Sequence, residues 1–272
     1  MSRRGIYGFA ELTTINPQET MKKSLLLWPL LILALAWTGG AAAASERAAA
    51  QEHFNQGLAA LSEGKPQAAV EQFTAALKIN PDLAEAYINR GIAYLRLDQT
   101  VDAVTDFDKA LELAPRSPEA LYNRGLAYNR GGLFDKALED YSEALIYAPR
   151  DWQIYYNRGN TYLDMGKAKE ALADYQEALK LHPQAPEILH NRGLAYLAMG
   201  RPQEALEDAD AVLALDPNFA RAYFGKGQAL EKLGMKAAAV AAYRRFLETG
   251  NPETDAALLQ QSLERLRALE GK

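Results

Sequence analysis

Apolar side chains recur along this chain at the spacing of amphipathic helices, and two such stretches alternate within each period of about 34 residues. The string YNRGLAY at Tyr122–Tyr128 returns in nearly the same form at residues 88–94, 156–162 and 190–196. A string repeated at a fixed period indicates architecture, whereas a catalytic motif normally occurs once. No segment shows sustained strand alternation, so the pattern predicts an all-α fold built from helix pairs.

Glycine and proline mark the ends of the predicted helices. The first stretch of each unit ends near a glycine, which can supply the positive φ that a helix C-terminus favours, with Asp98 in its place once. The second stretch ends just before a proline, which does not easily continue a helix. The glycines are Gly64, Gly132, Gly166, Gly200 and Gly234, and the prolines are Pro81, Pro115, Pro149, Pro183 and Pro217.

The small and aromatic residues of the units resemble the pattern of the tetratricopeptide repeat (TPR) family. The unit at 118–151 carries it as Leu121, Gly125, Tyr128, Ala137, Tyr141, Ala144 and Pro149. Units 84–117 and 152–185 match as fully, while units 50–83, 186–219 and 220–253 match more weakly. The resemblance implies a right-handed superhelix, an α-solenoid, of six helix-turn-helix repeats within residues 45–253. It is specific for the fold and says little about the ligand.

A polar helix is expected to close the solenoid at its C-terminal end, in residues 252–272. Asn251-Pro252 can start this helix. Its expected apolar stripe is Ala256, Leu259, Leu263 and Leu266. An open solenoid needs such a cap because its last hydrophobic face would otherwise meet water.

The N-terminal segment predicts export. Residues 21–44 contain a basic start, an apolar stretch from Leu25 to Trp37, and alanines before Ser45, which together are typical of a secretory signal peptide. Cleavage near Ala44 would give a periplasmic or secreted protein. Without cleavage, the segment would anchor the repeats outside the cytoplasm at the inner membrane. Residues 1–20 precede this complete signal, so we interpret them as a misassigned start ahead of Met21 or as a disordered extension.

Composition narrows the classes of function. The 272-residue chain carries a net charge of −5 and no cysteine. The acidic balance disfavours nucleic acid as the partner, because phosphate binding requires a basic face. The absence of cysteine removes disulfides and thiol catalysis. The three histidines are too scattered for a metal site, and no phosphate loop, nucleophile elbow or positioned acid–base pair is present. We therefore expect no enzyme activity, no cofactor and no metal.

An arginine precedes the glycine in four repeats, where the family normally has a leucine-like residue. An arginine at a helix–helix seam needs a partner, and the second helices offer one aspartate each at a common position. We expect a structural clamp, formed either within a repeat (Arg90 with Asp106) or between repeats (Asp106 with Arg124), and we favour the second pairing slightly. The clamp residues are Arg90, Arg124, Arg158, Arg192, Asp106, Asp140, Asp174 and Asp208.

The asparagine of the repeated string predicts a binding groove. By resemblance to the family, this position of the first helices faces the concave side of the solenoid. Each amide would offer a donor and an acceptor to a peptide backbone. The alternative is that asparagine is simply common at this position of the family and has no role in binding. The expected groove residues are Asn55, Asn89, Asn123, Asn157, Asn191, Phe54, Tyr122, Tyr156, His190, Phe224, Leu126 and Asn160.

These features predict a non-catalytic scaffold or adaptor of the cell envelope that binds an extended peptide or a partner helix in the concave groove. The aromatic residues would form an exposed rim of the groove, unless they only pack between neighbouring first helices. The alternative is a module that self-associates or binds partners through its convex face or helical edges. Contact with a membrane is expected only through an uncleaved N-terminal segment.

Overall fold

The computed structural model describes residues 44–271, and in this range the chain forms helices and no strand. A first helix at residues 44–62 pairs with α2 (Pro66–Ile79). The later pairs are α3 (Ala84–Arg96) and α4 (Thr100–Leu113), α5 (Pro118–Arg130) and α6 (Phe134–Tyr147), α7 (Trp152–Asp164) and α8 (Ala168–Leu181), α9 (Pro186–Ala198) and α10 (Pro202–Leu215), and α11 (Ala220–Lys232) and α12 (Lys236–Thr249). The all-α solenoid of helix pairs is confirmed. The expected signal peptide up to residue 43 and the segment 1–20 lie outside the described residues.

The helix ends follow from the residues that the sequence places there. In the pair of α5 and α6, Gly132 adopts φ 72°, a left-handed conformation that glycine enters without a steric penalty. The N–H of Leu133 then bonds to the carbonyl of Tyr128 at 2.9 Å, which closes the helix end as in a Schellman motif. Asp98 takes the same role with φ 58° and is the one non-glycine residue at positive φ in residues 44–271.

Small residues let the two helices of a pair approach closely. The α-carbon of Gly125 lies over the ring of Tyr141, and a methyl group added to Gly125 would come within 2.7 Å of that ring. Tyr141 is fully buried, together with Ala137 and Ala144 on the same helix. The glycine and the aromatic residue therefore fit each other across every pair except that of α9 and α10, where Ala209 replaces the ring.

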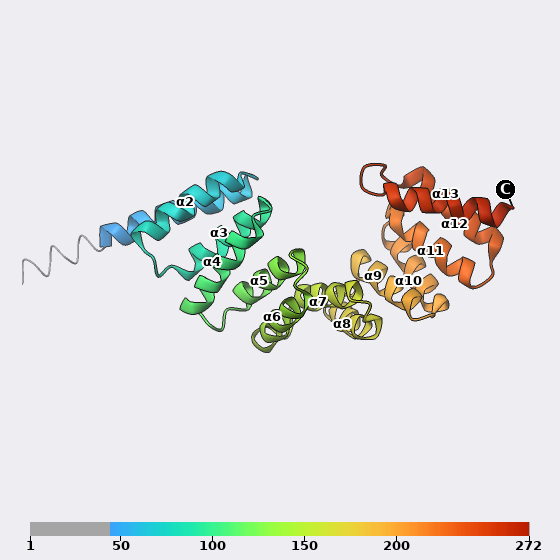
Figure 1. Cartoon of the computed structure of the whole chain (residues 1–272), viewed down its shortest axis with the longest axis horizontal. Helices are drawn as coiled ribbons and strands as arrows, with labels where there is room; N and C mark the ends of the chain where they lie inside the picture. The colour runs from blue at the N-terminus through green and yellow to red at the C-terminus, as the bar shows by residue number, and fades with distance from the viewer. Residues whose placement is uncertain (1–43, 272) are drawn as a thin grey trace, which may run out of the picture.

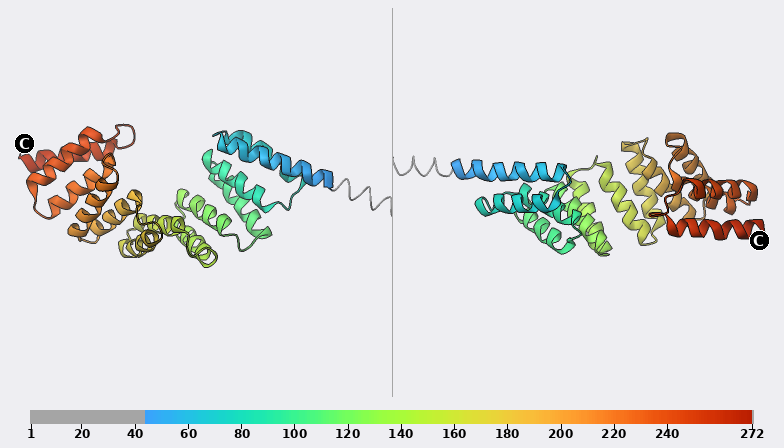
Figure 2. Two further views of the ribbon diagram at one scale, coloured as in Figure 1. Left: turned by 180° about the vertical axis from the view of Figure 1, so that it is seen from behind. Right: turned by 90° about the horizontal axis from the view of Figure 1, so that it is seen from above.

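The helix pairs stack into an open arc, which Figure 1 shows from one side and Figure 2 from behind and from above. Figure 1 places α5, α7 and α9 toward the inner side of the arc and α6, α8 and α10 toward the outer side. First helices contact the next first helix, as α3 does with α5 and α9 with α11. The second helices have no contact of this extent with one another in the described chain. The inner side is therefore the concave face.

The C-terminal cap begins later than its sequence suggested. Residues 251–255 form a turn, and α13 spans Ala256–Glu270. Asp255 is buried at this turn, where its carboxylate accepts from the N–H of Asn251 at 3.1 Å and from Nε of Arg221 at 2.7 Å. The first bond closes the turn and the second ties it to α11, and the helix starts after this turn rather than at Pro252.

The buried side of α13 also differs from the expected stripe. Ser262 and Leu266 are buried, and Leu258, Leu259 and Leu269 pack on the core around Phe246. Leu259 and Leu266 of the expected stripe thus lie on the buried side, whereas Ala256 and Leu263 are exposed, Leu263 by 41%. None of the helices in residues 44–271 has the length and apolarity needed to cross a membrane.

Candidate binding surfaces

The asparagines of the first helices use their amide nitrogens inside the protein. Nδ2 of Asn89 and of Asn123 donates to the backbone carbonyl four residues earlier, at 2.8 Å in both cases. Nδ2 of Asn157 donates to the carbonyl of Gln153 and to the hydroxyl of Tyr122, at 2.9 Å each. An amide nitrogen carries two N–H donors, so Asn157 has used both, whereas Asn89 and Asn123 have each used one. Among these three, the expectation that each amide offers both a donor and an acceptor is therefore wrong for Asn157 only. The Oδ1 atoms of all three receive no hydrogen bond from the described residues, so the row presents acceptors.

The two ends of the asparagine row differ from its middle. Nδ2 of Asn191 donates to Oδ1 of Asn160 at 2.8 Å and to the hydroxyl of Tyr156 at 3.1 Å. Oδ1 of Asn160 also accepts from the hydroxyl of Tyr175. Asn55 is exposed, and its Oδ1 accepts from Gln51 at 3.0 Å. Oδ1 of Asn191 accepts no bond from the described residues, so the free acceptors lie on α3, α5, α7 and α9.

The aromatic residues beside the asparagines pack inward. Phe54 and Phe224 are 6% and 5% exposed, and Ile88 in the same series is 4% exposed. Four of the five rings lie against the aromatic residue of their own second helix, as Phe54 does against Phe73 with ring centroids 5.7 Å apart. His190 has Ala209 at that place and packs on Phe219 instead. The expected exposed rim is therefore wrong at Phe54 and Phe224, whereas Tyr122, Tyr156 and His190 are half-buried and keep part of their surface exposed.

Burial changes the acid–base behaviour of this series. It raises the pKa of Tyr122 to about 12, so the hydroxyl that accepts from Asn157 stays protonated. Burial, helped by the nearby charge of Arg221, lowers the pKa of His190 to about 4. The His190 ring packs 5.3 Å from the ring of Phe219. At neutral pH this position of the groove is therefore uncharged.

Apolar side chains lie next to the asparagine row. Leu58 is 39% exposed, while Ile92, Leu126 and Leu194 are half-buried at the corresponding positions. Glu85, Glu119 and Glu187 lie one helical turn before the asparagines and are exposed. Residues four apart share one face of a helix, so these glutamates border the same concave surface. The surface therefore combines an apolar floor, a row of amide acceptors and an acidic border.

The arginines of the repeated string pair with the aspartates of their own repeats. Nε of Arg124 donates to Oδ2 of Asp140 at 2.8 Å and its Nη2 donates to Oδ1 at 2.7 Å. Arg90 with Asp106, Arg158 with Asp174, and Arg192 with Asp208 have the same bidentate geometry. The pairing between repeats that the sequence slightly favoured is wrong. A bidentate pair fixes the plane of the guanidinium, which orients the second helix on the first.

The third nitrogen of the guanidinium reaches the preceding repeat. Nη1 of Arg124 donates to Asp108 of α4 at 2.6 Å, and Arg90 and Arg158 reach Thr74 and Ser142 at the same repeat position. Each of these arginines thus joins its own helix pair to the second helix before it. Lys226 keeps only this contact, with Asp210 of α10 at 2.6 Å, because α12 has Ala242 where the other repeats have aspartate.

The paired aspartates are almost completely buried, with Asp106, Asp140 and Asp208 each 4% exposed. Burial raises the pKa of the Asp106 carboxyl, although the hydrogen bonds and charge of Arg90 act against this shift. The guanidinium of Arg90 also lies 5.5 Å from the ring centre of Tyr87 and 5.9 Å from that of Tyr94. A buried ion pair with its hydrogen bonds filled in this way has little capacity left for an external anion.

Two further contacts between repeats were not predicted from the sequence. Nη1 of Arg96 donates to the carbonyl of Leu61 at 2.7 Å, and Nη1 of Arg130 donates to the carbonyl of Leu95 at 2.6 Å. Each arginine satisfies the C-terminal carbonyl of the preceding first helix. Arg96 and Arg130 occupy the same position in the last turn of successive first helices, 34 residues apart. This shared position could have indicated the contact.

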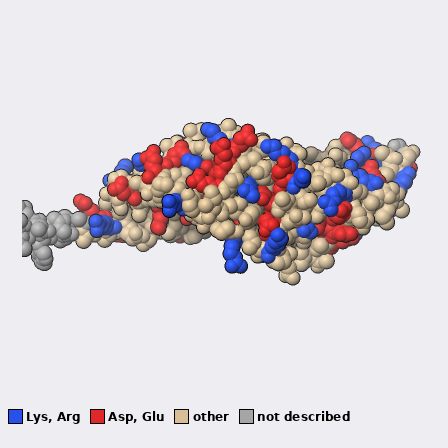
Figure 3. Space-filling view, turned by 90° about the horizontal axis from the view of Figure 1, so that it is seen from below, with Lys and Arg blue, Asp and Glu red and all other residues tan. Residues whose placement is uncertain are grey.

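Charge is mixed over the outer face of the arc. In Figure 3, which looks from below the view of Figure 1, acidic and basic side chains are interspersed and no continuous basic area covers this face. Nucleic acid binding requires such a basic area, so this face lacks the charge pattern for it. In the part of the chain that the structure describes, no three His, Asp or Glu side chains are grouped as metal ligands.

Comparison with known proteins identifies related repeats. A family model described as "Tetratricopeptide repeat" matches residues 54–118, 88–153 and 190–255, and a second, described as "TPR repeat", matches residues 159–200. No curated protein sequence gives a significant match.

Solved structures share the fold. YrrB, described as a TPR protein with an unusual peptide-binding site, is 25% identical, with a TM-score of 0.59 over 71% of this chain and 98% of that chain. A tetratricopeptide repeat protein from Parabacteroides merdae is 20% identical, with a TM-score of 0.65 over 81% of this chain and 90% of that chain. The pilF protein of Pseudomonas aeruginosa is 19% identical, with a TM-score of 0.66 over 79% of this chain and 99% of that chain.

Proposed function

This chain belongs to the tetratricopeptide repeat family, and we propose that it is a non-catalytic scaffold that binds an extended peptide or a partner helix along the concave face of its arc. Proteins of this fold serve protein–protein interaction, and the peptide-binding site described for YrrB supports a peptide as the ligand here. The partner is another polypeptide, held by side chains of successive first helices.

One observation carries the proposal: the row of amide oxygens on α3, α5, α7 and α9 that accept no hydrogen bond from the described residues. The amide nitrogens beside them each make at least one bond inside the protein, so the oxygens are the groups that every one of these asparagines presents. An extended peptide offers N–H donors along its length. The glutamates that border the row favour a partner with basic side chains. The partner we propose is therefore rich in donors and carries positive charge.

A second candidate is self-association through the outer face. It is favoured by exposed apolar side chains on second helices, where Val101 is 80% exposed and Ile146 is 73% exposed. Sedimentation of residues 45–272 over a range of concentrations separates the two candidates. A monomer at all concentrations supports the adaptor, and a concentration-dependent dimer supports self-association.

We place this scaffold in the cell envelope, exported by the segment at residues 21–44. The support is the sequence pattern of that segment, most of which lies outside the described residues. Cleavage after Ala44 would release the repeats, and an uncut segment would keep them at the membrane. Mass spectrometry of the N-terminus of the expressed full chain distinguishes the two, since a cleaved chain begins with Ser45.

The binding proposal is tested by affinity capture from an envelope extract with residues 45–272 as bait. The test variant carries Glu85→Lys, Glu119→Lys and Glu187→Lys, which reverse the charge of the groove border without removing an internal hydrogen bond. A second variant carries Asn89→Ala, Asn123→Ala and Asn157→Ala. Both variants are expected to lose the partner that the parent retains, with unchanged helicity by circular dichroism.

A matched control changes three residues at one position of the second helices, Glu112→Ala, Ile146→Ala and Lys180→Ala, all of them exposed. The control is expected to keep the partner. If the groove variants retain the partner and the control loses it, the partner binds the outer face and the concave-face proposal is rejected.

A further inference from the structure

The last repeat differs from most of the others at five positions that face one another. Lys226 and Ala242 replace the arginine and aspartate of the clamp, and Leu230 replaces the tyrosine that stacks beside it. Ala238 stands where the earlier repeats have Asp102, Lys136, Glu170 and Glu204, and Ala241 stands where three of them have Thr105, Glu139 and Glu207. Each of these residues is smaller than its counterpart in most repeats. The space between the helices, which the clamp fills in other repeats, is therefore not filled by side chains here.

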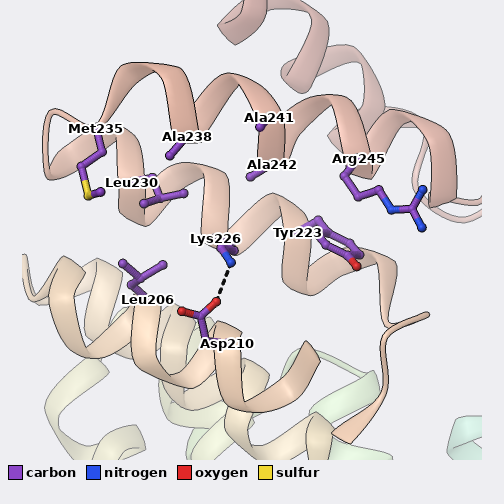
Figure 4. A pocket seen from close by; sticks show the side chains of 10 residues that line it. All are labelled: Leu206, Asp210, Tyr223, Lys226, Leu230, Met235, Ala238, Ala241, Ala242 and Arg245. Atoms are coloured by element: carbon purple, nitrogen blue, oxygen red, sulfur yellow. Dashed lines mark ion pairs between the residues drawn. The ribbon is translucent and has the colours of Figure 1, made fainter. Parts of the chain in front are cut away.

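The space that results is a pocket of about 500 Å³ between α10, α11 and α12. Figure 4 shows Leu206, Leu230 and Met235 at one end, with the methyl of Ala238 above them. Tyr223 and Arg245 lie at the other end. This volume lies within the range of roughly 300–1,000 Å³ that is usual for small-molecule sites. The pocket belongs to this repeat because the equivalent space in the repeat of α9 and α10 holds the ring of Tyr196 with Arg192 and Arg201 around it.

Each of the two cations that line the pocket has a single carboxylate partner. Lys226 is paired with Asp210 of α10, and α12 brings no carboxylate to it because Ala242 has none. Arg245 adds a second positive charge, 5.9 Å from the ring centre of Tyr223, and bonds outward to Glu248. The lining residues therefore carry two positive charges and one negative charge, and an anion that entered beside Ala242 would restore the missing half of the clamp.

We propose that this pocket binds a small carboxylic acid with an apolar body. Its carboxylate lies beside the methyl of Ala242, at the position of the aspartate carboxylates in the earlier repeats, and accepts hydrogen bonds from Lys226. Its apolar body takes the place of the missing tyrosine ring, against Leu206, Leu230 and Met235. The same chemistry could be presented by a carboxylate side chain next to an aromatic one in a polypeptide, and the test below distinguishes the two sources. This site is separate from the concave face.

The test is to titrate the full chain with 3-phenylpropionate and to measure binding by calorimetry and by ligand-observed NMR. The neutral 3-phenylpropionamide serves as the matched ligand, and N-acetyl-Asp-Phe-amide represents the polypeptide source. We expect saturable binding of the acid, and binding of the amide weaker by about tenfold or more, as for the loss of a charge-assisted hydrogen bond. Equal binding of acid and amide, no saturable binding of the acid, or binding of the dipeptide alone would overturn the proposal.

Two variants locate the site. The double change Leu230→Tyr and Ala242→Asp restores the residues of the other repeats, so it is expected to fold and to fill the pocket, with loss of binding. Lys226→Gln is expected to weaken binding of the acid by about tenfold while leaving the amide unaffected. Lys180→Gln, an exposed lysine on α8, is the control and is expected to bind like the parent. Parent-like binding by the double variant, at unchanged or higher thermal stability, would contradict the assignment.

Discussion

At the scale of single residues, the arginine of the repeated string does the most to join the repeats. Arg124 contacts three helices: α5 carries it, α6 provides Asp140, and α4 provides Asp108. The two aspartates differ in burial, since the Asp140 side chain is 6% exposed and the Asp108 side chain is 49% exposed. The buried partner should therefore dominate the free energy of the interaction, because water screens the exposed pair.

Asp140→Ala is expected to lower the free energy of unfolding by about 3 kcal/mol, since it leaves the Arg124 guanidinium largely buried without its main partner. Asp108→Ala on the same guanidinium should cost less than about 1 kcal/mol. Urea denaturation followed by circular dichroism measures both. The double variant Arg124→Leu and Asp140→Leu should recover much of the loss, because no unpaired charge remains. Equal effects of the two single changes would contradict this account.

At the scale of helix pairs, the contact between a glycine and an aromatic ring sets how closely the two helices pack. A methyl group on Gly125 would lie 2.7 Å from Tyr141, whereas one on Gly193 would meet Cβ of Asp208 at 3.5 Å, an ordinary contact. The difference arises because α10 carries Ala209 where α6 carries Tyr141. The two glycines occupy the same repeat position and form a natural matched pair.

Gly125→Ala is expected to lower the free energy of unfolding by about 1 to 2 kcal/mol, because the overpacked ring must shift. Gly193→Ala is expected to raise it by up to about 1 kcal/mol, because alanine favours the helix and the space beside it is free. Thermal denaturation of the two variants beside the parent measures the difference. Destabilisation of both variants by the same amount would show that the ring does not set the helix spacing.

At the scale of the whole molecule, the substantial helix contacts of the described chain join neighbours or next-but-one helices. Stability in such a solenoid is close to a sum of local terms, so its ends need separate protection. The C-terminal end is protected by α13, which covers the core around Phe246 and is tied to α11 by Asp255 and Arg221.

Truncation after Gly250 is expected to lower the melting temperature and to cause concentration-dependent association, because the apolar surface around Phe246 and Tyr243 becomes exposed. Thermal melting and sedimentation measure the two effects. Leu263→Ala in the intact chain is the control, since Leu263 is 41% exposed and is not among the side chains that pack on the core around Phe246, and it should change neither result. A truncated chain that stays monomeric and melts at the parent temperature would contradict the role of α13 as a cap.

The sequence by itself determined the repeat, the helix ends and the fit within each pair. These features depend on residues close along the chain. Gly132 ends α5 because it adopts positive φ, and Gly125 faces Tyr141 within one helix pair, a combination that recurs with the period of 34 residues. The acidic balance and the lack of cysteine likewise limited the chemistry that could be expected.

Only the tertiary structure decided which groups meet between neighbouring pairs. Arg124, Arg158 and Arg192 each have an aspartate in their own repeat and another in the preceding one, and the stagger of the helices selects between them. Burial decided that Phe54 and Phe224 pack inward. Contacts with neighbouring helices occupy the amide nitrogens of Asn157 and Asn191, while the oxygens of both residues remain available. The pocket of the last repeat likewise depends on five residues from α11 and α12 facing one space, which no single position in the sequence reveals.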